Sequence, residues 1–332
     1  MSRYAAVHTN TKGPGDARPT ALQIIKDEGL ENKLQGQVFV ITGTSSGIGI
    51  ETVRAIAATG ATLYLTARDL DKAKTALDGI FDSSRMELIQ MDQGSLASVR
   101  TAAAAILNKA SKIHCLIANA GIMAIPDLRF TADGHELQFG TNHLSHFLFF
   151  QLLKPALLAA ASPDLPSRVV VLSSSGHNIN GINDSDNYAF EHSDYDPNVA
   201  YAQSKTANIY MANEIERRYG AQHLHATSVH PGIIHTGLTR HMPPDAFKGM
   251  EHIYPLMKSV EQGAATTVWA AVGEAWKHDG GKYLVDCDVA RPAVDGDDKM
   301  IGLGYAPHAY DVEKAKRLWK DSNKLVVLDD EE

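Results

Sequence analysis

Tyr201 and Lys205 stand four residues apart in the sequence. In a helix, residues at this spacing lie on one face, about one turn from each other. An ammonium group close to a phenol favours the phenolate, so we expect the pKa of Tyr201 to move from about 10 toward neutrality. Such a tyrosine can exchange a proton with an alcohol or a carbonyl oxygen. The same spacing recurs at Tyr254–Lys258 and Tyr310–Lys314, so position in the chain must decide among the three.

The composition is that of a globular protein: 44% of the 332 residues are hydrophobic and 21% are charged. The formal net charge of −8 argues against a general nucleic-acid or anionic-membrane surface. Cys115 and Cys287 are too few for a disulfide framework, which favours a reducing compartment. There is neither a signal-peptide pattern nor an apolar span of about 18 residues. We therefore expect a cytoplasmic protein without a membrane anchor.

Short apolar runs alternate with helical segments from residue 36 onward. The runs lack strict polar alternation, which is typical of strands in a parallel sheet that helices cover on both faces. We predict an α/β fold with one doubly wound parallel sheet of about seven strands, in a single domain over residues 36–290. Strands are expected at 38–42, 61–67, 86–91, 113–118, 168–173, 224–229 and 282–286. Helices are expected up to residue 59 and at 69–77, 95–110, 134–161 with an interruption near Pro155, 200–219 and 262–276.

Two extensions flank this domain, at residues 1–35 and 291–332. The first twenty residues are polar and rich in Gly, Pro and Thr, so we expect a mobile tail. Residues 20–34 are expected to form a short helix that packs on the main domain or on a partner subunit. In the second extension, 312–320 has a helical pattern, and the four acidic residues that end the chain are expected to be solvated.

A glycine-rich turn follows the first expected strand and opens a helix, with Gly43, Gly47 and Gly49 within seven residues. Glycines let the backbone approach a pyrophosphate, and the N-terminus of the helix favours the negative charge. An ordinary strand-to-helix turn is the alternative, but three glycines at this junction favour a Rossmann-type dinucleotide site.

The spacing Thr-Gly-x-x-x-Gly-x-Gly resembles the short-chain dehydrogenase/reductase family, and the resemblance extends over about residues 36–290. Further motifs of the family follow in order on the expected elements: Asn119-Ala120-Gly121, Asn142, Ser173-Ser174, Tyr201 with Lys205, and Pro231-Gly232 with Thr236. Within the family, the run that begins at Asn142-His143-Leu144 and the histidine at His177 look most like retinol dehydrogenases and WW-domain-containing oxidoreductases.

Position in the chain also separates the three tyrosines. Tyr201 lies on a helix after the serine-bearing strand, so both can meet at the carboxyl edge of the sheet. Tyr254 is followed by Pro255, which is unsuited to a helix interior, and Tyr310 lies beyond the last strand. Tyr201 is therefore the predicted catalytic tyrosine.

The resemblance implies hydride transfer between a nicotinamide and a carbonyl or alcohol. Tyr201 would donate or accept the proton, and Lys205 would lower its pKa and hold the nicotinamide ribose. Ser174 would polarise the substrate oxygen, with Ser173 and Ser175 as competitors for this role. Asn142 would position a water that links Lys205 to solvent.

The expected cofactor is NADP(H) in preference to NAD(H). The second strand ends without the acid that binds a ribose 2′-hydroxyl, and Arg68 follows it, suited to a 2′-phosphate. Asp69 comes next, but a helix N-cap explains it equally well. Asp92 would contact the adenine as in the family. The remaining cofactor contacts are expected from Gly43, Ser45, Ser46, Gly47, Ile48, Gly49, Asn119, Ala120, Gly121, Tyr201, Lys205, Pro231, Gly232, Ile234 and Thr236.

Two segments are expected to line the substrate side. Residues 176–200 form an acidic, solvated loop without the ligand spacing of a calcium loop. Residues 233–260 are rich in Met, Pro and aromatic residues and read as a lid over a lipophilic substrate, with a loop packed on its own domain as the alternative. The histidines are scattered, so no metal is predicted.

The leading hypothesis is an NADP(H)-dependent oxidoreductase for a carbonyl or secondary alcohol of a lipophilic small molecule, such as a secondary-metabolite, terpenoid or retinoid-like compound. A broad-specificity detoxifying carbonyl reductase is the alternative within enzymes, and an NADP(H)-sensing binding module is the alternative outside them. The complete set of Asn142, Ser174, Tyr201 and Lys205 argues against a sensor. Family members commonly pair through the helices that bear Asn142 and Tyr201, so a homo-oligomer is possible.

Overall fold

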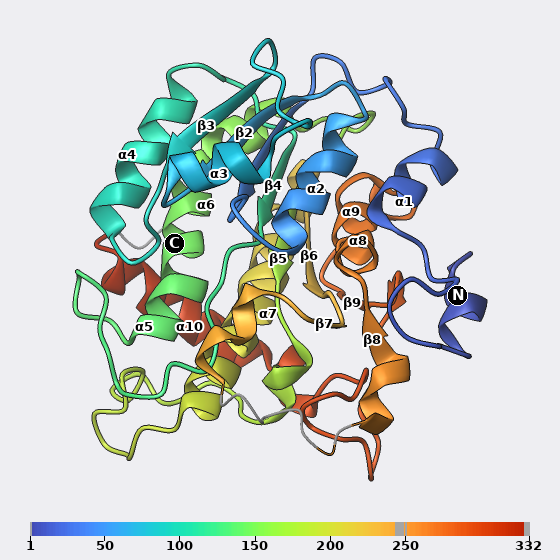
Figure 1. Cartoon of the computed structure of the whole chain (residues 1–332). Helices are drawn as coiled ribbons and strands as arrows, with labels where there is room; N and C mark the ends of the chain where they lie inside the picture. Colours follow the sequence, from blue (N-terminus) through green and yellow to red (C-terminus); the bar gives the residue numbers. More distant parts are fainter. Residues whose placement is uncertain (1, 243–248, 250, 329–332) are drawn as a thin grey trace.

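An eight-stranded sheet forms the centre of the computed structural model, which describes residues 2–242, 249 and 251–328 (Figure 1). The strand order is β10-β9-β6-β5-β4-β1-β2-β3, and only the short β10 pairs antiparallel with its neighbour. The strands are β1 (Val38–Thr42), β2 (Thr62–Ala67), β3 (Met86–Gln90), β4 (Cys115–Ala118), β5 (Ser167–Leu172), β6 (Leu224–His230), β9 (Tyr283–Val285) and β10 (Asp288–Val289). The prediction of a doubly wound parallel sheet is confirmed.

The order of the strands reverses at β1. The chain runs outward from β1 to β2 and β3, then returns to β4 on the other side of β1. Phe39 pairs with Leu63 of β2 on one side and with Cys115 of β4 on the other. In open α/β sheets, ligands bind at the carboxyl ends of the strands where the order reverses. The glycine-rich turn and the Asn119 segment therefore meet at this edge.

Helices cover both faces of the sheet (Figure 1). One core contains α4, α6 and α7, and the other contains α1, α2 and α9. The helices are α1 (Ala21–Asp27), α2 (Ile48–Ala57), α3 (Leu70–Ala76), α4 (Leu96–Leu107), α5 (Leu137–Phe139), α6 (Ser145–Ala160), α7 (Pro197–Tyr219), α8 (Val260–Gly263), α9 (Ala265–Val272) and α10 (Val312–Leu325). None of the helices in the described residues is both long and apolar enough to span a lipid bilayer.

The start of α7 follows from local sequence. The Asp196 carboxylate accepts hydrogen bonds from the amides of Asn198 and Val199, and Pro197 occupies the first turn. An N-cap aspartate satisfies amides that have no partner within the helix, and proline is favoured in the first turn. These residues therefore fix where the helix carrying Tyr201 and Lys205 begins.

The expected interruption near Pro155 was wrong. The helix α6 runs through Pro155 to Ala160. The flanking Leu153 and Leu157 are fully buried, and this packing holds the helix together where proline removes one hydrogen bond. The irregularity lies earlier, in a π-helical turn over Gly140–Leu144 that carries Asn142. Such turns are frequent at functional sites.

The first twenty residues also differ from the expected mobile tail. Tyr4 and Arg18 are 6% and 4% exposed, and a 3₁₀ turn forms over Ala5–His8. The short helix α1 was correctly expected, and its Ile24 and Ile25 join the core that contains α2 and α9. The segment therefore packs on its own domain.

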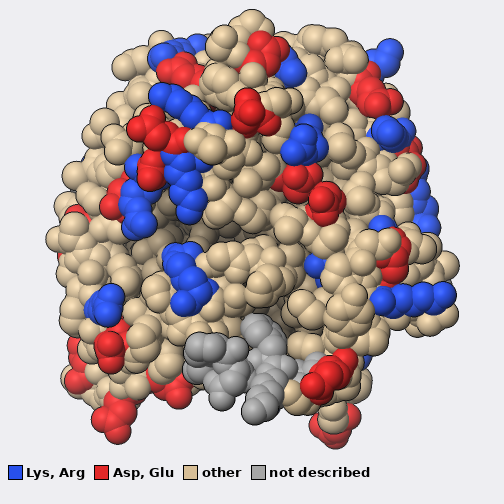
Figure 2. Space-filling view, in the orientation of Figure 1, with Lys and Arg blue, Asp and Glu red and all other residues tan. Residues whose placement is uncertain are grey.

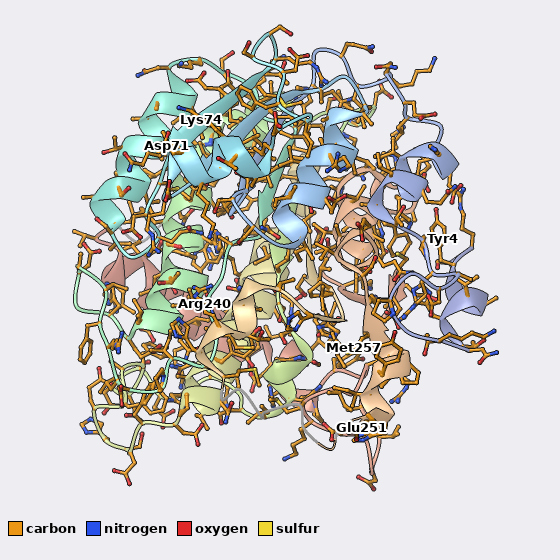
Figure 3. The ribbon with its side chains drawn as sticks, in the orientation of Figure 1. Tyr4, Asp71, Lys74, Arg240, Glu251 and Met257 are labelled. Atoms are coloured by element: carbon orange, nitrogen blue, oxygen red, sulfur yellow. The ribbon has the colours of Figure 1, made fainter. Side chains whose placement is uncertain are left out.

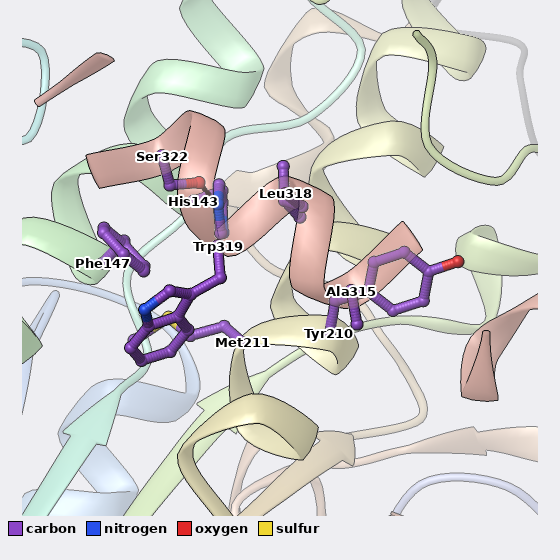
Figure 4. Close-up of a pocket in the computed structure, with 8 residues that line it drawn as sticks. All are labelled: His143, Phe147, Tyr210, Met211, Ala315, Leu318, Trp319 and Ser322. Atoms are coloured by element: carbon purple, nitrogen blue, oxygen red, sulfur yellow. Dashed lines mark hydrogen bonds between the residues drawn. The ribbon is translucent and has the colours of Figure 1, made fainter. Parts of the chain in front are cut away.

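The helix α10 was expected to end near residue 320 but continues to Leu325. Trp319 packs edge-on against Phe147 of α6, and Ser322 pairs with His143 (Figure 4). The eight described residues drawn there leave no water-sized space between them. This helix packs against α6 and α7 in the core that they share, and a homo-oligomer stays a prediction. The acidic end at 329–332 lies outside the described residues.

Candidate active site

The structure separates the three candidate serines by what each hydroxyl contacts. Ser173 donates to the backbone carbonyl of Lys205 at 2.8 Å, and Ser175 donates to that of Met300 at 2.6 Å. The Ser174 Oγ and the Tyr201 ring both lie beside Gly176. A Cβ added to Gly176 would be 3.4 Å from Ser174 Oγ and 3.1 Å from a Tyr201 ring carbon. Of the three, only Ser174 is brought to the tyrosine.

Tyr201 and Lys205 lie on one face of α7 as their spacing predicts. The Lys205 Nζ is 5.5 Å from the centre of the Tyr201 ring and donates to the Leu172 carbonyl at 3.1 Å. Both side chains are buried, at 7% and 5% exposure. The other tyrosines are elsewhere: Tyr254 is 56% exposed, and the Tyr310 hydroxyl accepts the Tyr283 amide.

The expected direction of the shift in the Tyr201 pKa was wrong. Burial raises the pKa of Tyr201 to about 12, and a hydrogen bond with Ser174 opposes this only in part. Burial also lowers the pKa of Lys205 to about 8. Spacing on the helix placed the ammonium near the phenol, but it carried no information about how completely α7 is buried. Desolvation of the phenolate is therefore the larger effect.

Asn142 is held in the π-helical turn by its side chain. Its Oδ1 accepts the Ile122 amide at 2.8 Å, and its Nδ2 donates to the Ile122 carbonyl and to Ser204 Oγ, both at 2.9 Å. A Cβ added to Gly121 would lie 3.3 Å from Asn142 Oδ1 and 3.5 Å from Lys205 Nζ. Asn142 and Lys205 therefore meet beside Gly121.

His146 was missed by the sequence reasoning. Its Nδ1 pairs with the Asn142 carbonyl and its Nε2 with Thr42 Oγ1, both at 2.9 Å. The same Thr42 oxygen accepts the amides of Asn119 and Ala120 at 3.0 Å. Because Thr42 Oγ1 already accepts two hydrogen bonds, the Thr42 hydroxyl donates its own proton to His146 Nε2. His146 therefore carries its proton on Nδ1. Its spacing of four from Asn142 was the available signal.

The glycine-rich turn has no space for a side chain at Gly43 or at Gly49. Gly43 and Gly47 have φ of +73° and +63°, and a Cβ on Gly43 would lie 2.7 Å from the Ala120 Cα. A Cβ on Gly49 would lie 2.2 Å from the Gly43 carbonyl oxygen. Among the residues that the structure describes, no side chain caps α2. The close backbone approach and the uncapped helix start fit a bound pyrophosphate.

Near the end of β2, Arg68 and Asp69 have different environments. Asp69 accepts the Lys72 amide at 2.9 Å and caps α3, as the alternative interpretation stated. Arg68 is exposed, and within the described residues its guanidinium forms neither a hydrogen bond nor an ion pair. Asp92 accepts the Gly94 amide at 2.9 Å and so shapes its own turn.

The turn after β6 lies against the glycine-rich turn. A Cβ on Gly47 would lie 3.5 Å from Thr236, and one on Gly263 would lie 2.7 Å from Ile234. Strand β7 (Ile233–Ile234) pairs with β8 (Met257–Lys258). The turns that follow β1 and β6 therefore meet at the carboxyl edge of the sheet through Gly47 and Thr236.

The segments expected to line the substrate side are only partly described, since 243–248 and 250 lie outside the described residues. The loop 176–200 is not merely solvated: its Tyr188 is 5% exposed and donates to Asp321 of α10 at 2.7 Å. The stretch 300–306 also contacts the site, and it was not assigned there from the sequence. There Ser175 contacts Met300, and the Ala306 amide donates to His177 Nε2 at 3.2 Å.

Comparison with known proteins agrees with this geometry. A family model described as short chain dehydrogenase matches residues 37–246. The chain is 46% identical over 329 residues to short-chain dehydrogenase/reductase prx1 of Penicillium roqueforti, covering 98% of this chain and 95% of that protein. It is 33% identical over 299 residues to retinol dehydrogenase 11 of Mus musculus, covering 89% and 88%. A solved structure of an uncharacterized protein from Mycobacterium Paratuberculosis is similar with a TM-score of 0.70 and 31% identity, covering 94% and 99%.

The chain therefore belongs to the short-chain dehydrogenase/reductase family, as its motifs predicted. It is an oxidoreductase that acts on CH–OH groups, and the family uses an NAD(P) cofactor. The likeness to a retinol dehydrogenase, expected from the Asn142 and His177 segments, is also confirmed.

Proposed function

We propose that the protein is an NADP(H)-dependent oxidoreductase that transfers a hydride between the nicotinamide and a carbonyl or secondary alcohol of a lipophilic small molecule. Tyr201 is its general acid and base. The observation that carries this proposal is the pairing of Ser174 with the buried Tyr201 above Lys205, at the sheet edge that also carries the glycine-rich turn.

The cofactor, when bound, supplies or accepts the hydride. In reduction, the Ser174 hydroxyl donates a hydrogen bond to the substrate oxygen, and the Tyr201 hydroxyl donates its proton there. In oxidation, Tyr201 must first be deprotonated, which its raised pKa opposes. The charged Lys205 favours that phenolate, and Asn142 holds the turn beside it.

The preference for NADP(H) is supported by the free guanidinium of Arg68, because a planar guanidinium binds a 2′-phosphate through two hydrogen bonds. Figure 2 shows Lys and Arg side chains over α3, above the hollow at the centre of this face. Arg68 and Lys72 are both exposed here. Asp69 is engaged as a cap, so it is not a competing ligand for a ribose hydroxyl.

A lipophilic substrate is supported by apolar side chains left exposed on the segments beside the site. Met300, whose carbonyl binds Ser175, and Leu303 are 45% and 40% exposed. The name of the relative retinol dehydrogenase 11 also points to an apolar alcohol. Cytoplasmic location is supported by the two free, buried thiols of Cys115 and Cys287.

The catalytic assignment is tested by Tyr201→Phe, with NADPH and a panel of aliphatic, aromatic, terpenoid and retinoid carbonyls. We expect turnover to fall by about 10³-fold or more, while NADPH affinity stays within about twofold. The matched control is Tyr310→Phe, which removes a hydroxyl from a second Tyr-x-x-x-Lys pattern and should keep wild-type turnover. Near wild-type activity of Tyr201→Phe would refute the mechanism. Tight NADPH binding by the wild type without turnover of any carbonyl would instead favour a sensor.

The cofactor preference is tested by Arg68→Gln. We expect the KM for NADPH to rise about tenfold or more, while the KM for NADH changes little, because only the 2′-phosphate loses a partner. Lys74→Gln is the control: Lys74 is exposed and pairs with Asp71 of its own helix. A wild-type preference for NADH would contradict the assignment.

A further inference from the structure

Arg18, in the segment that precedes the family match, is a buried cation surrounded by backbone carbonyls. Its Nη1 donates to the Leu256 carbonyl at 2.9 Å, and its Nη2 contacts those of Pro255 and Met257 at 3.4 and 2.5 Å. Its side chain is 2% exposed, and its Nε donates to the Asp16 carboxylate at 2.8 Å. The guanidinium thus binds three successive carbonyls of one distant stretch.

That stretch lies beside the turn after β6 through strand pairing. Met257 and Lys258 form β8, which pairs with Ile233 and Ile234 of β7. Figure 3 labels Met257 on this stretch and Tyr4 at the start of the N-terminal segment. Arg18, Gly232 and Lys258 also line one small cavity of about 40 Å³. The cation therefore sits directly behind the turn that carries the expected nicotinamide contacts.

Lys258 continues the connection into the turn itself. Its Nζ lies 3.3 Å from the Pro231 carbonyl and 2.6 Å from the Asp286 carboxylate. Gly232 has a φ of +105°, and a Cβ there would lie 2.8 Å from the Lys258 side chain. Lys258, the second residue of β8, therefore contacts both Pro231 and Gly232.

The N-terminal segment is itself locked in place by Gln262. Its Oε1 accepts the Gly15 amide at 2.9 Å, and its Nε2 donates to the backbone carbonyls of Asp16 and Arg18 at 3.1 Å. The same glutamine completes the capping box of α8 with Ser259. Arg18 is thus preorganised by Asp16 and by Gln262, so that it can position other groups with little loss of entropy.

We propose that Arg18 is a positioning residue of the active site: it anchors the Pro255–Met257 carbonyls, and through β8 and Lys258 it fixes the turn 231–236 for the nicotinamide. This role rests on the proposed function, because that function assigns the turn to the cofactor. Lysine would not replace it, since a single ammonium cannot match several carbonyls and a carboxylate with the planar fork of arginine.

The test uses the full chain with Arg18→Ala and Arg18→Lys, and Arg3→Ala as the matched control. Arg3 is also in the N-terminal segment, but it bonds the Asp27 carbonyl and Glu28. We expect the KM for NADPH to rise about tenfold in Arg18→Ala, with kcat within about threefold, because the turn is displaced while Tyr201 is untouched. Arg18→Lys should lie between this variant and the wild type.

Hydrogen exchange measured without cofactor or substrate gives an independent readout. Amides in 231–236 and 255–258 should exchange faster in Arg18→Ala, while those of β1 to β4 keep wild-type protection. Methylguanidinium at millimolar concentration should restore part of both the exchange protection and the KM. Wild-type exchange in these two peptides would overturn the proposal, even if the protein turned over no carbonyl.

Loss of protection throughout the sheet in both Arg18 variants would also overturn it, because Arg18 would then be a general stability residue. If Arg18→Ala does not fold, the KM for NADPH and the hydrogen exchange of Arg18→Lys alone test the proposal. A protected turn with no NADPH turnover in the wild type would refute the proposed function and leave the anchoring role standing.

Discussion

The two halves of the site are built differently. In the nucleotide half, residues 36–121, the contacts bring backbone of one motif against another, as where Gly43 meets Ala120 and where Thr42 Oγ1 accepts the Asn119 and Ala120 amides. In the substrate half, residues 122–310, some side chains join segments more than 100 residues apart. Examples are Ser175 with Met300 and His177 with Ala306.

This difference follows from what each half must recognise. A pyrophosphate is bound by amides and a helix N-terminus, so the nucleotide half needs glycines in a fixed local order. A substrate oxygen is addressed by hydroxyls and charges that must be buried and aligned together. The substrate half therefore depends on distant segments, among them Arg18 from the N-terminal segment and the stretch 300–306.

The largest expected effect is acid unfolding that begins in the substrate half. Burial lowers the pKa values of four histidines to about 3 or 4, all between residues 143 and 230: His143, His146, His177 and His230. The unfolded chain binds more protons than the folded one between these values and 6.5, so stability is lost as pH falls through that window. The four groups together should lower the free energy of unfolding by roughly 5 kcal/mol for each pH unit below about pH 6.

Hydrogen exchange and urea unfolding between pH 7 and 4.5 would measure this. The nucleotide half contains a single histidine, His114, whose pKa burial also lowers. Peptides from the substrate half should therefore lose protection first. Equal loss of exchange protection in both halves would contradict the prediction. So would a free energy of unfolding that does not change from pH 7 to 5.

The next effect tests the nucleotide half through Gly43→Ala. A Cβ there meets Ala120 at 2.7 Å, and φ is +73°. We expect NADPH affinity to fall about 100-fold or more, because the turn must move to relieve the clash. The control is Gly79→Ala, whose φ is +71° with nothing within 4 Å, so it carries only the conformational strain of about 1 kcal/mol. Similar NADPH affinities of the two variants in calorimetry would show that close approach at Gly43 is unimportant.

The smallest effect concerns Lys205, which joins the halves beside Gly121. Burial lowers the pKa of Lys205 from 10.5 to about 8. Between these two pH values the unfolded chain binds one proton more than the folded chain, so the free energy of unfolding rises with pH there. Lys205→Met removes this buried charge and should stabilise the protein by roughly 2–3 kcal/mol at pH 7, with the gain shrinking above pH 8. The Leu172 carbonyl keeps a partner, because Asn208 also donates to it.

Thermal unfolding at pH 7 and pH 10 would decide this, with Lys74→Met as the control because Lys74 is 64% exposed. A Lys205→Met variant that is less stable than wild type at pH 7 would show that the ammonium is well compensated. Activity should be lost in either case.

Several site features were predictable because they depend on short-range rules. The glycine-rich turn is set by positive φ, the Tyr201–Lys205 pair by helical spacing, and the Asp69 cap by its place before α3. Each of these needs only a few neighbouring residues. The family and the parallel sheet followed from their order along the chain.

By itself, the sequence determined which residues stand at each strand end and helix turn, because periodicity, capping and glycine conformations are local properties. Tertiary structure alone decided what the competing Ser173 and Ser175 hydroxyls bind instead, and how burial moves the pKa values of Tyr201 and Lys205. It also decided that Arg18 supports the turn after β6. These depend on solvent exclusion and on contacts between distant segments, which no pattern of nearby residues encodes.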